Sequence, residues 1–191
     1  MKNKKGLIII GVIVLAVVII AGSLIGNYNS LVENEESVAA ARADIQTQLQ
    51  RRADLIPNFV ATVKGYSDYE KETYTAVTEA RTKVANAQNP EQMQAANEQL
   101  DGAISVWVNA ITEAYPDLKA NQNYIALQDE LAGTENRIAQ ARIKYNESAT
   151  KYNVKIRKFP TSILAGMFGF EKVDLFEAAE GSANVPQVSF D

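Results

Sequence analysis

The residues whose types and spacing could support chemistry are concentrated in one stretch, RRADLIPN, from Arg51 to Asn58. Successive residues of a helix point about 100° apart, so only one of Arg51 and Arg52 can face a helical core. That arginine is expected to form an ion pair across the core, and Glu135 and Glu113 are the candidate partners. Such a pair fixes the register between helices. Binding of an anionic ligand is the alternative role for the two cations.

A second candidate pattern is the doublet Tyr-Asn, which occurs three times in the chain. Tyr145 and Tyr152 are seven residues apart and therefore share one face of a helix. A buried tyrosine needs a partner for its hydroxyl group, and the adjacent Asn146 and Asn153 are expected to hydrogen-bond to a neighbouring helix. The doublets therefore predict a polar layer that sets helix register, with ligand recognition as the alternative.

The composition excludes several classes of active site. The chain of 191 residues has no Cys and no His, which excludes Cys/His zinc sites, His-ligated haem and His-dependent catalytic triads. Paired carboxylates would need a cleft, which a narrow bundle does not offer, and no glycine-rich phosphate loop is present. We therefore expect no enzyme activity, no catalytic residue, no metal and no cofactor. The net charge of −4 also argues against binding to nucleic acid.

Residues 7–25, LIIIGVIVLAVVIIAGSLI, form an uncharged run that would span about 28 Å as a helix, close to the hydrocarbon thickness of a bilayer. This run predicts a membrane anchor over residues 7–26. A cleaved signal peptide is the alternative, because AGS at 21–23 resembles a cleavage site. The apolar run continues through Leu24 and Ile25, however, which favours an uncleaved anchor.

The flanking charges predict the orientation of this anchor. Lys2, Lys4 and Lys5 precede it, whereas Arg42 is the first cation that follows it. The positive-inside rule then places residues 1–6 in the cytoplasm and the rest of the chain on the other side. We expect a single-pass membrane protein with a cytoplasmic N-terminus and its helical domain outside the cytoplasm.

The chain beyond the anchor has the periodicity of long helices. A seven-residue stripe, typical of helices packed in a left-handed bundle, consists of Tyr124, Leu131, Ile138, Tyr145, Tyr152 and Phe159. The preceding helix is expected to begin at Asn89 as N-cap, with Pro90 at the first position and Gln92 reaching back in a capping box. It should end near Tyr115, because Pro116 follows. Asp117 is expected to cap the next helix.

The region 30–88 permits two interpretations. A helical stripe runs through Pro57, which usually bends or breaks a helix. Either the helix bends at Pro57 and breaks at Gly65, before a capping box at 67–70, or the chain turns fully near Asp54–Pro57, with Asp54 as a cap. Both interpretations give four helices. They predict an all-α protein in which an N-terminal transmembrane helix precedes an antiparallel up-and-down four-helix bundle over residues 28–160.

Six short motifs resemble those of the LemA family: RRADLIPN, VKGY at 63–66, YPDLKAN at 115–121, TEN at 134–136, AR..YN at 141–146 and FP at 159–160. The resemblance runs from Tyr28 to about Phe170 and implies a membrane-anchored, all-helical bacterial protein without a defined activity. It also implies that the membrane is the bacterial inner (cytoplasmic) membrane and that the helical domain is periplasmic or extracellular. The candidate structural or interaction residues on these motifs and the Tyr-Asn doublets are Arg51, Arg52, Asp54, Pro57, Asn58, Tyr115, Pro116, Asp117, Glu135, Asn136, Arg142, Tyr145, Asn146, Tyr152 and Asn153.

The C-terminal region combines cations with large apolar residues. The segment 161–177 and the residues just before it are interpreted either as a cap over the end of the bundle, which is slightly favoured, or as an interfacial contact with lipid. The candidate residues for lipid contact are Phe159, Ile163, Leu164, Met167, Phe168 and Phe170. Residues 178–191 are expected to form a flexible tail.

These features lead to a non-catalytic envelope protein whose anchored bundle binds or organises other proteins. The alternative is a membrane-organising homo-oligomer whose C-terminal aromatic segment contacts lipid. A ligand sensor or a carboxylate-based enzyme is the least favoured interpretation. The sequence does not identify the partner protein or the oligomeric state.

Overall fold

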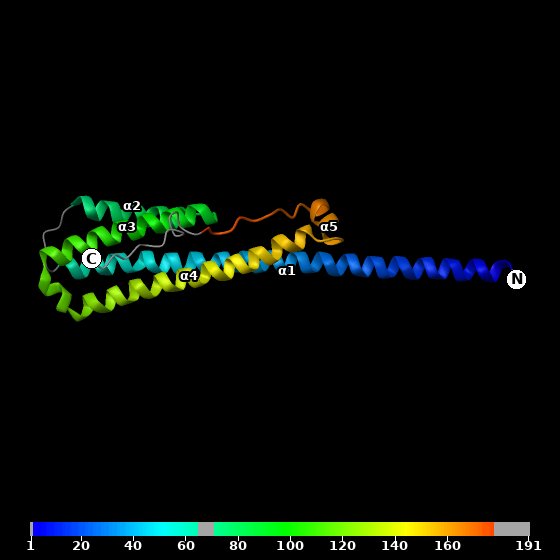
Figure 1. Ribbon diagram of the computed structural model, residues 1–191, viewed down its shortest axis with the longest axis horizontal. Helices are drawn as coiled ribbons and strands as arrows, with labels where there is room; N and C mark the ends of the chain where they lie inside the picture. Colours follow the sequence, from blue (N-terminus) through cyan, green and yellow to red (C-terminus); the bar gives the residue numbers. More distant parts are fainter. Residues whose placement is uncertain (1, 65–70, 178–191) are drawn as a thin grey trace, which may run out of the picture. The chain divides into compact units, whose positions relative to one another are not determined.

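The computed structural model describes residues 2–64 and 71–177, and every regular element within those ranges is helical (Figure 1). The predicted all-α fold with a long apolar N-terminal helix is therefore confirmed. The elements are α1 (Lys2–Lys64), α2 (Lys71–Asn86), α3 (Pro90–Ala114), the 3₁₀ helix η1 (Pro116–Ala120), α4 (Gln122–Arg157) and α5 (Thr161–Phe168).

The chain divides into two compact units. The first contains residues 1–43 and 143–173, and so combines the N-terminal part of α1 with the C-terminal part of α4 and with α5. The described residues of the second are 44–64, 71–142 and 174–177, so it combines the remainder of α1, α2, α3, η1 and the first part of α4. The domain boundaries expected from the sequence stay a prediction.

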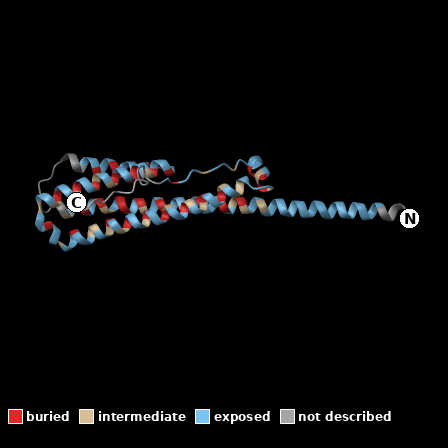
Figure 2. Ribbon diagram, in the orientation of Figure 1, coloured by how far each residue is buried: buried red, intermediate tan, exposed pale blue. Residues whose placement is uncertain are grey.

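The second unit is the four-helix bundle. Its buried side chains recur at three- and four-residue steps along each helix (Figure 2), as expected when one stripe of each helix faces a common core. At one level of this core the ring of Phe59 lies 4.7 Å from that of Trp107 and 5.4 Å from that of Tyr124. These rings come from α1, α3 and α4, so the aromatic side chains of the predicted stripe fill the interior.

The first unit pairs the α1 residues that follow the anchor with the end of α4. Leu31 and Val38 are buried on α1, and Tyr145 and Tyr152 are buried on α4. The predicted stripe is wrong at its last position, Phe159, which is exposed. The physical reason is that α4 ends at Arg157, so the helical periodicity no longer applies two residues later.

The ends of α3 follow the local sequence. The Asn89 side chain accepts a hydrogen bond of 2.8 Å from the backbone N–H of Gln92, and the Gln92 side chain accepts one of 3.0 Å from the backbone N–H of Gln88. Pro90 occupies the start of the helix. This reciprocal arrangement is the predicted capping box, with Gln92 reaching one residue further back than expected. The helix ends at Ala114, immediately before Tyr115 and Pro116, as predicted.

The expected cap of α4 is wrong. Asp117 lies within η1, and the side chain of Asn121 instead accepts hydrogen bonds from the backbone N–H groups of Asn123 (2.9 Å) and Tyr124 (3.2 Å). The 3₁₀ turn after Pro116 delays the start of α4 by one turn, so the capping position moves from Asp117 to Asn121.

The interpretation that the chain turns near Asp54–Pro57 is also wrong. Helix α1 continues without interruption through both residues to Lys64. A proline inside a helix lacks one N–H donor and costs about 3 kcal/mol, but its neighbours Ile56, Phe59 and Val60 are all buried and stabilise the helical conformation. The first two helices therefore separate beyond Lys64. Gly65 and the expected capping box at 67–70 lie outside the described residues.

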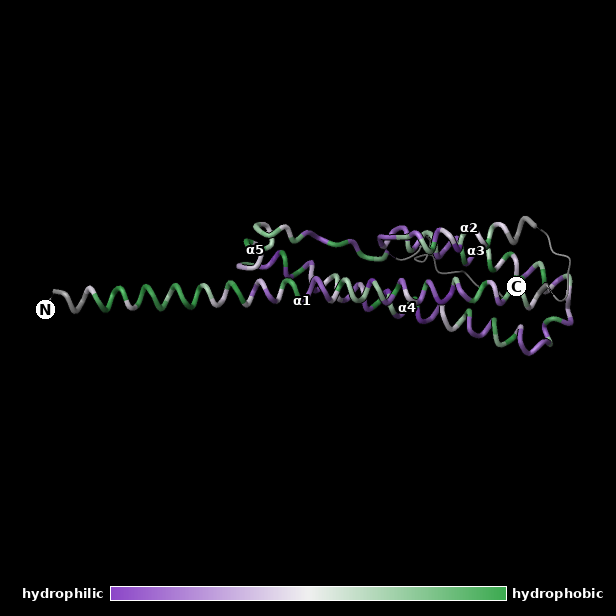
Figure 3. Tube along the Cα trace, turned by 180° about the vertical axis from the view of Figure 1, so that it is seen from behind, coloured by the Kyte–Doolittle hydropathy of each residue, from purple (hydrophilic) through white to green (hydrophobic). Residues whose placement is uncertain are grey.

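The N-terminal part of α1 is the most apolar segment of the described chain. Its large side chains from Leu7 to Ile25 are exposed on all sides of the helix, and Figure 3 shows this part of the chain as predominantly hydrophobic. Among the described residues, this helix is long and apolar enough to cross a membrane. A helix that is hydrophobic all round and lacks protein neighbours is typical of a segment surrounded by lipid.

Candidate functional site

The candidate site of the second unit is centred on Arg52, whose side chain is only 6% exposed. Its guanidinium group donates a hydrogen bond of 3.1 Å to the side-chain oxygen of Asn97 on α3 and pairs with Glu135 on α4 at 2.7 Å. It also forms an ion pair with Asp101 on α3. One side chain from α1 is thus bonded to both α3 and α4, and the Arg52–Glu135 pair expected from the sequence is present.

Asn97 and Asp101 are functional residues that sequence reasoning missed. They lie four residues apart on α3, and the Asn97 side chain donates a hydrogen bond of 3.0 Å to Asp101. The sequence contains a signal for them, because both are polar residues in or beside the stripe of buried apolar residues that includes Met93, Leu100 and Ile104. Glu113, the other acid considered for pairing with an arginine, is exposed.

The surroundings of Asp101 change its acidity. Burial raises its pKa to about 6, and the neighbouring Glu135 carboxylate acts in the same direction, while the positive charges of Arg52 and Arg142 act against it. Removing a carboxylate from water disfavours its charged form, and here that effect exceeds the attraction of the nearby guanidinium groups.

Arg142 completes the polar cluster. Burial lowers the pKa of its guanidinium group, against the opposing influence of Glu135, Asp101 and Glu98. The guanidinium carbon also lies 5.4 Å from the centre of the buried Phe176 ring, a cation–π contact. The two cations of the cluster are therefore matched by acids of α3 and α4. This arrangement neutralises its own charge and holds helices in register, and it leaves little positive potential to attract an anionic ligand.

Arg51 points away from this cluster. Its side chain is 57% exposed and pairs with Glu130 at 2.7 Å, and Glu130 also pairs with Arg137. The two adjacent arginines thus separate in the way that helical geometry predicted, with one inside and one outside. Asp54 accepts a hydrogen bond of 2.8 Å from Gln50 and pairs with Arg81 on α2 at 3.4 Å, and because it lies inside the continuous helix α1 it is not a helix cap.

The remaining candidates on the motifs do not gather at this cluster. Asn58 and Asn136 are exposed, whereas Tyr115 is half-buried at the end of α3. In the first unit Tyr145 and Tyr152 are buried, and burial raises the pKa of Tyr152, with smaller contributions from Glu35 and Glu171.

The expected contact of Asn153 with a neighbouring helix is wrong. Its side-chain amide donates a hydrogen bond of 2.8 Å to the carbonyl of Val173 and accepts one of 3.0 Å from the backbone N–H of Val173. Asn153 therefore binds the extended segment that follows α5, because that segment and not another helix lies against this face of α4.

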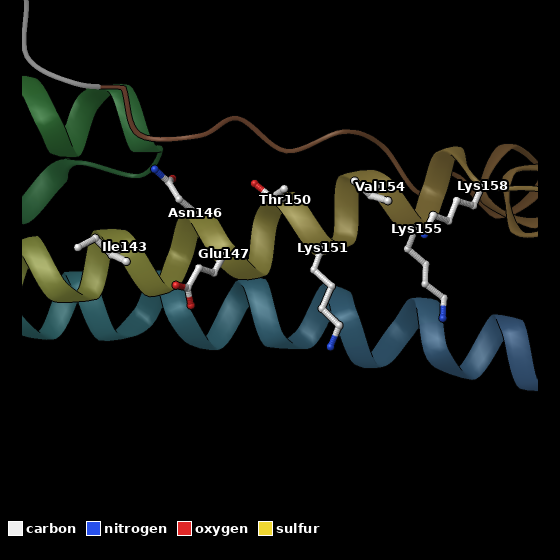
Figure 4. A pocket seen from close by; sticks show the side chains of 8 residues that line it. All are labelled: Ile143, Asn146, Glu147, Thr150, Lys151, Val154, Lys155 and Lys158. Atoms are coloured by element: carbon white, nitrogen blue, oxygen red, sulfur yellow. The ribbon is translucent and has the colours of Figure 1, made fainter. Parts of the chain in front are cut away.

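The exposed face of α4 carries a shallow groove of about 840 Å³ in the first unit. Its lining residues recur at alternating steps of three and one residues, which places them on one helical face: Ile143, Asn146, Glu147, Thr150, Lys151, Val154, Lys155 and Lys158. Asn146 and Thr150 project to one edge of this face, and Lys151 and Lys155 project to the opposite edge (Figure 4). Two exposed aliphatic side chains, Ile143 and Val154, lie between charged neighbours.

Comparison with known proteins gives consistent results. The model of the LemA family matches residues 41–190, which extends beyond the region in which the motifs were found. The chain is 29% identical to Protein LemA of Metamycoplasma hominis over 160 residues, covering 82% of this chain and 71% of that protein. It is 27% identical over 189 residues to Magnetosome protein MamQ 2 of Paramagnetospirillum magneticum, covering 86% and 70% of the two chains. It is also 27% identical to Magnetosome protein MamQ of Magnetospirillum gryphiswaldense over 194 residues, covering 88% and 71%.

The Arg52 cluster predicts a large difference between two adjacent arginines. Replacing Arg52 by Met leaves Asp101 and Glu135 without their shared cation, so we expect the free energy of unfolding to fall by about 3 kcal/mol. Arg51→Met is the matched control and should cost less than about 1 kcal/mol, because the Arg51–Glu130 pair is exposed to solvent. The measurement is urea unfolding of the full chain in detergent, followed by the fluorescence of Trp107, the single, buried tryptophan. Equal losses for the two variants would contradict the assignment.

The raised pKa of Asp101 predicts a pH dependence of stability. A carboxyl group with a higher pKa in the folded state than in the unfolded chain favours folding at low pH, and this contribution is lost as the pH rises through the folded pKa of about 6. The stability of the protein relative to Asp101→Asn should therefore decrease between about pH 4 and about pH 7. Urea unfolding at several pH values measures it. An increase over that range would mean that attraction to Arg52 outweighs burial.

Proposed function

Since the chain belongs to the LemA family, we propose that it is a non-catalytic, single-pass membrane protein of the bacterial cell envelope that binds other proteins through its helical domain. The observation that carries this proposal is the groove on α4. Its residues follow the spacing of a helix-packing seam, yet Ile143 and Val154 are exposed. A stripe with this period fits the apolar face of an additional helix.

The chemistry of the groove supports a helical protein partner. The aliphatic side chains supply apolar contact area near its two ends, and Thr150 offers a hydroxyl group between them. Lys151, Lys155 and Lys158 provide positive charges that would select a partner helix with acidic residues at the edges of its apolar face. We therefore propose an amphipathic, acidic-edged helix of another envelope protein as the occupant of this groove.

The interior of the second unit supports a structural role over catalysis. The buried Arg52 is paired with the partly exposed Asp101 and the exposed Glu135, so its ion pairs join three helices. The aromatic rings of Phe59, Trp107 and Tyr124 pack against one another in the core. Titratable groups committed to internal pairs stabilise a rigid body, which suits a protein that presents a surface to partners.

The groove can be tested by photo-crosslinking in membranes. A benzoyl-phenylalanine residue at Ile143 or Val154 of the full chain should give an adduct with a different protein, because both side chains would lie in the interface. The control position is Val106 on α3, which is also an exposed aliphatic residue but lies outside the groove. Adducts that contain only a second copy of this chain would favour the homo-oligomer instead, and adducts of equal yield at Val106 would reject the groove as the binding surface.

The orientation in the membrane is part of the proposal. Lys2, Lys4 and Lys5 before the anchor favour a cytoplasmic N-terminus and an extracytoplasmic helical domain. A single cysteine introduced at Val106 should then react with a membrane-impermeant maleimide in intact cells or, for a periplasmic domain, after the outer membrane is permeabilised. Reaction that occurs only after the inner membrane is disrupted would reverse this orientation.

A further inference from the structure

Helix α5 presents an exposed apolar face that the proposed groove does not explain. The exposed fractions are 83% for Phe159, 54% for Ile163, 72% for Met167 and 58% for Phe168. Ile163 and Met167 are four residues apart within α5 and lie on one side of it, and Phe159 lies exposed in the turn just before the helix. Four large apolar side chains exposed within ten residues of chain form a concentrated patch, unlike the scattered apolar residues of an ordinary surface.

The opposite face of α5 is attached to α1. The Thr161 hydroxyl donates a hydrogen bond of 3.0 Å to the side-chain oxygen of Asn27, and Leu164 and Ala165 form a buried cluster with Leu31. Phe168 lies at the border of the two faces, because its ring packs edge-on against that of Tyr28, with 4.8 Å between ring centres, while 58% of the residue remains exposed. Leu164 therefore belongs to the attachment, and Phe170 is half-buried against the same cluster, so neither contributes to the exposed patch.

These contacts fix the height of α5 along α1. The apolar run that fits a bilayer ends at Ile25, and the contacts to α5 come from Asn27, Tyr28 and Leu31. At about 1.5 Å per residue these positions lie roughly 3–9 Å beyond the end of the run, since α1 is one continuous helix. The headgroup region on each side of a bilayer is about 5–8 Å thick. Helix α5 is thus attached to α1 just beyond the apolar run (Figure 3), at the height that lipid headgroups would occupy around a run that spans the bilayer.

The charges next to the patch are those of an interfacial segment. Arg157 and Lys158 are exposed immediately before Phe159, and the ammonium group of Lys155 donates to the hydroxyl of Ser30 on α1. The acids Glu33 and Glu171 are also exposed in this unit and offset part of the positive charge. Attraction of the cations to lipid phosphate therefore supplements the apolar contact of the patch and does not replace it.

We propose that α5 is a membrane-surface helix. Its patch of Phe159, Ile163, Met167 and Phe168 inserts at the boundary between the headgroups and the acyl chains of the bilayer that α1 crosses, while Arg157 and Lys158 contact phosphate groups. The occupant of the patch is lipid, because the attachment to α1 holds the patch where lipid is present. This inference does not depend on the α4 groove or on any protein partner.

The absence of cysteine from the chain allows a direct test. Single cysteines at Ile163 and Met167 of the full chain are labelled with the environment-sensitive fluorophore NBD and reconstituted in vesicles of phosphatidylcholine and phosphatidylglycerol. We expect blue-shifted emission and strong quenching by lipids that carry a doxyl group near the headgroup. Ile143 is the matched control, an exposed isoleucine on α4 that lies about 21 Å before Arg157 along the helix. NBD at this position should be quenched several-fold less.

Two results would overturn the proposal. Emission from Ile163 and Met167 as red-shifted and unquenched as that from Ile143 would show that the patch faces water. Blue-shifted emission without quenching by doxyl lipids would show that protein, either a second copy or a partner, covers it. Replacing Arg157 and Lys158 by Gln should lower the quenching on anionic vesicles while leaving some on pure phosphatidylcholine, as expected when apolar contact and charge both contribute.

Discussion

The burial of one guanidinium group is the interaction on which the four-helix unit depends. A charge removed from water is tolerated only when partners surround it, and Arg52 obtains them from Asn97, Asp101 and Glu135. These partners belong to two other helices. The helices can therefore slide past one another only by separating the buried Arg52 cation from its two carboxylates. Apolar packing favours close contact, but it is the polar cluster that selects one register among those that bury similar area.

In the first unit, too, a polar contact fixes the position of one helix along another, although the residues are different and uncharged. There the apolar cluster of Leu31, Leu164 and Ala165 provides burial, and the hydrogen bond between Thr161 and Asn27 defines where α5 sits along α1. Placement by a few specific polar contacts lets a helix of eight residues keep a fixed position although it is too short to be stable alone. The exposed patch is a consequence, since within the described part of the chain only one side of α5 packs against protein.

Much of the fold could be predicted from residue types and spacing, because helix periodicity and caps are local properties. The capping box at Asn89 and the end of α3 before Pro116 depend on neighbouring residues and were found. The sequence permits continuity of α1 through Pro57 as one of two interpretations, but local signals do not decide between them, because the continuity depends on burial of Phe59 against rings from distant helices. The candidate site likewise combines features that local geometry predicts with features that depend on distant parts of the chain. The opposite directions of Arg51 and Arg52 follow from geometry alone, whereas Asp101 requires knowing which turn of α3 faces Arg52. Likewise, the partner of Asn153 is a segment without regular structure, which leaves no periodic signal.

The two hydrogen bonds between Asn153 and Val173 involve only the main chain of Val173. A side-chain amide that bonds to both the N–H and the C=O of one residue recognises the path of the backbone and not the identity of the side chain. The amino acid at position 173 can therefore vary during evolution without releasing the segment, with proline as the exception because it has no N–H to donate. Selection should act instead on Asn153, so the sequence of the segment can change while its path along α4 is kept.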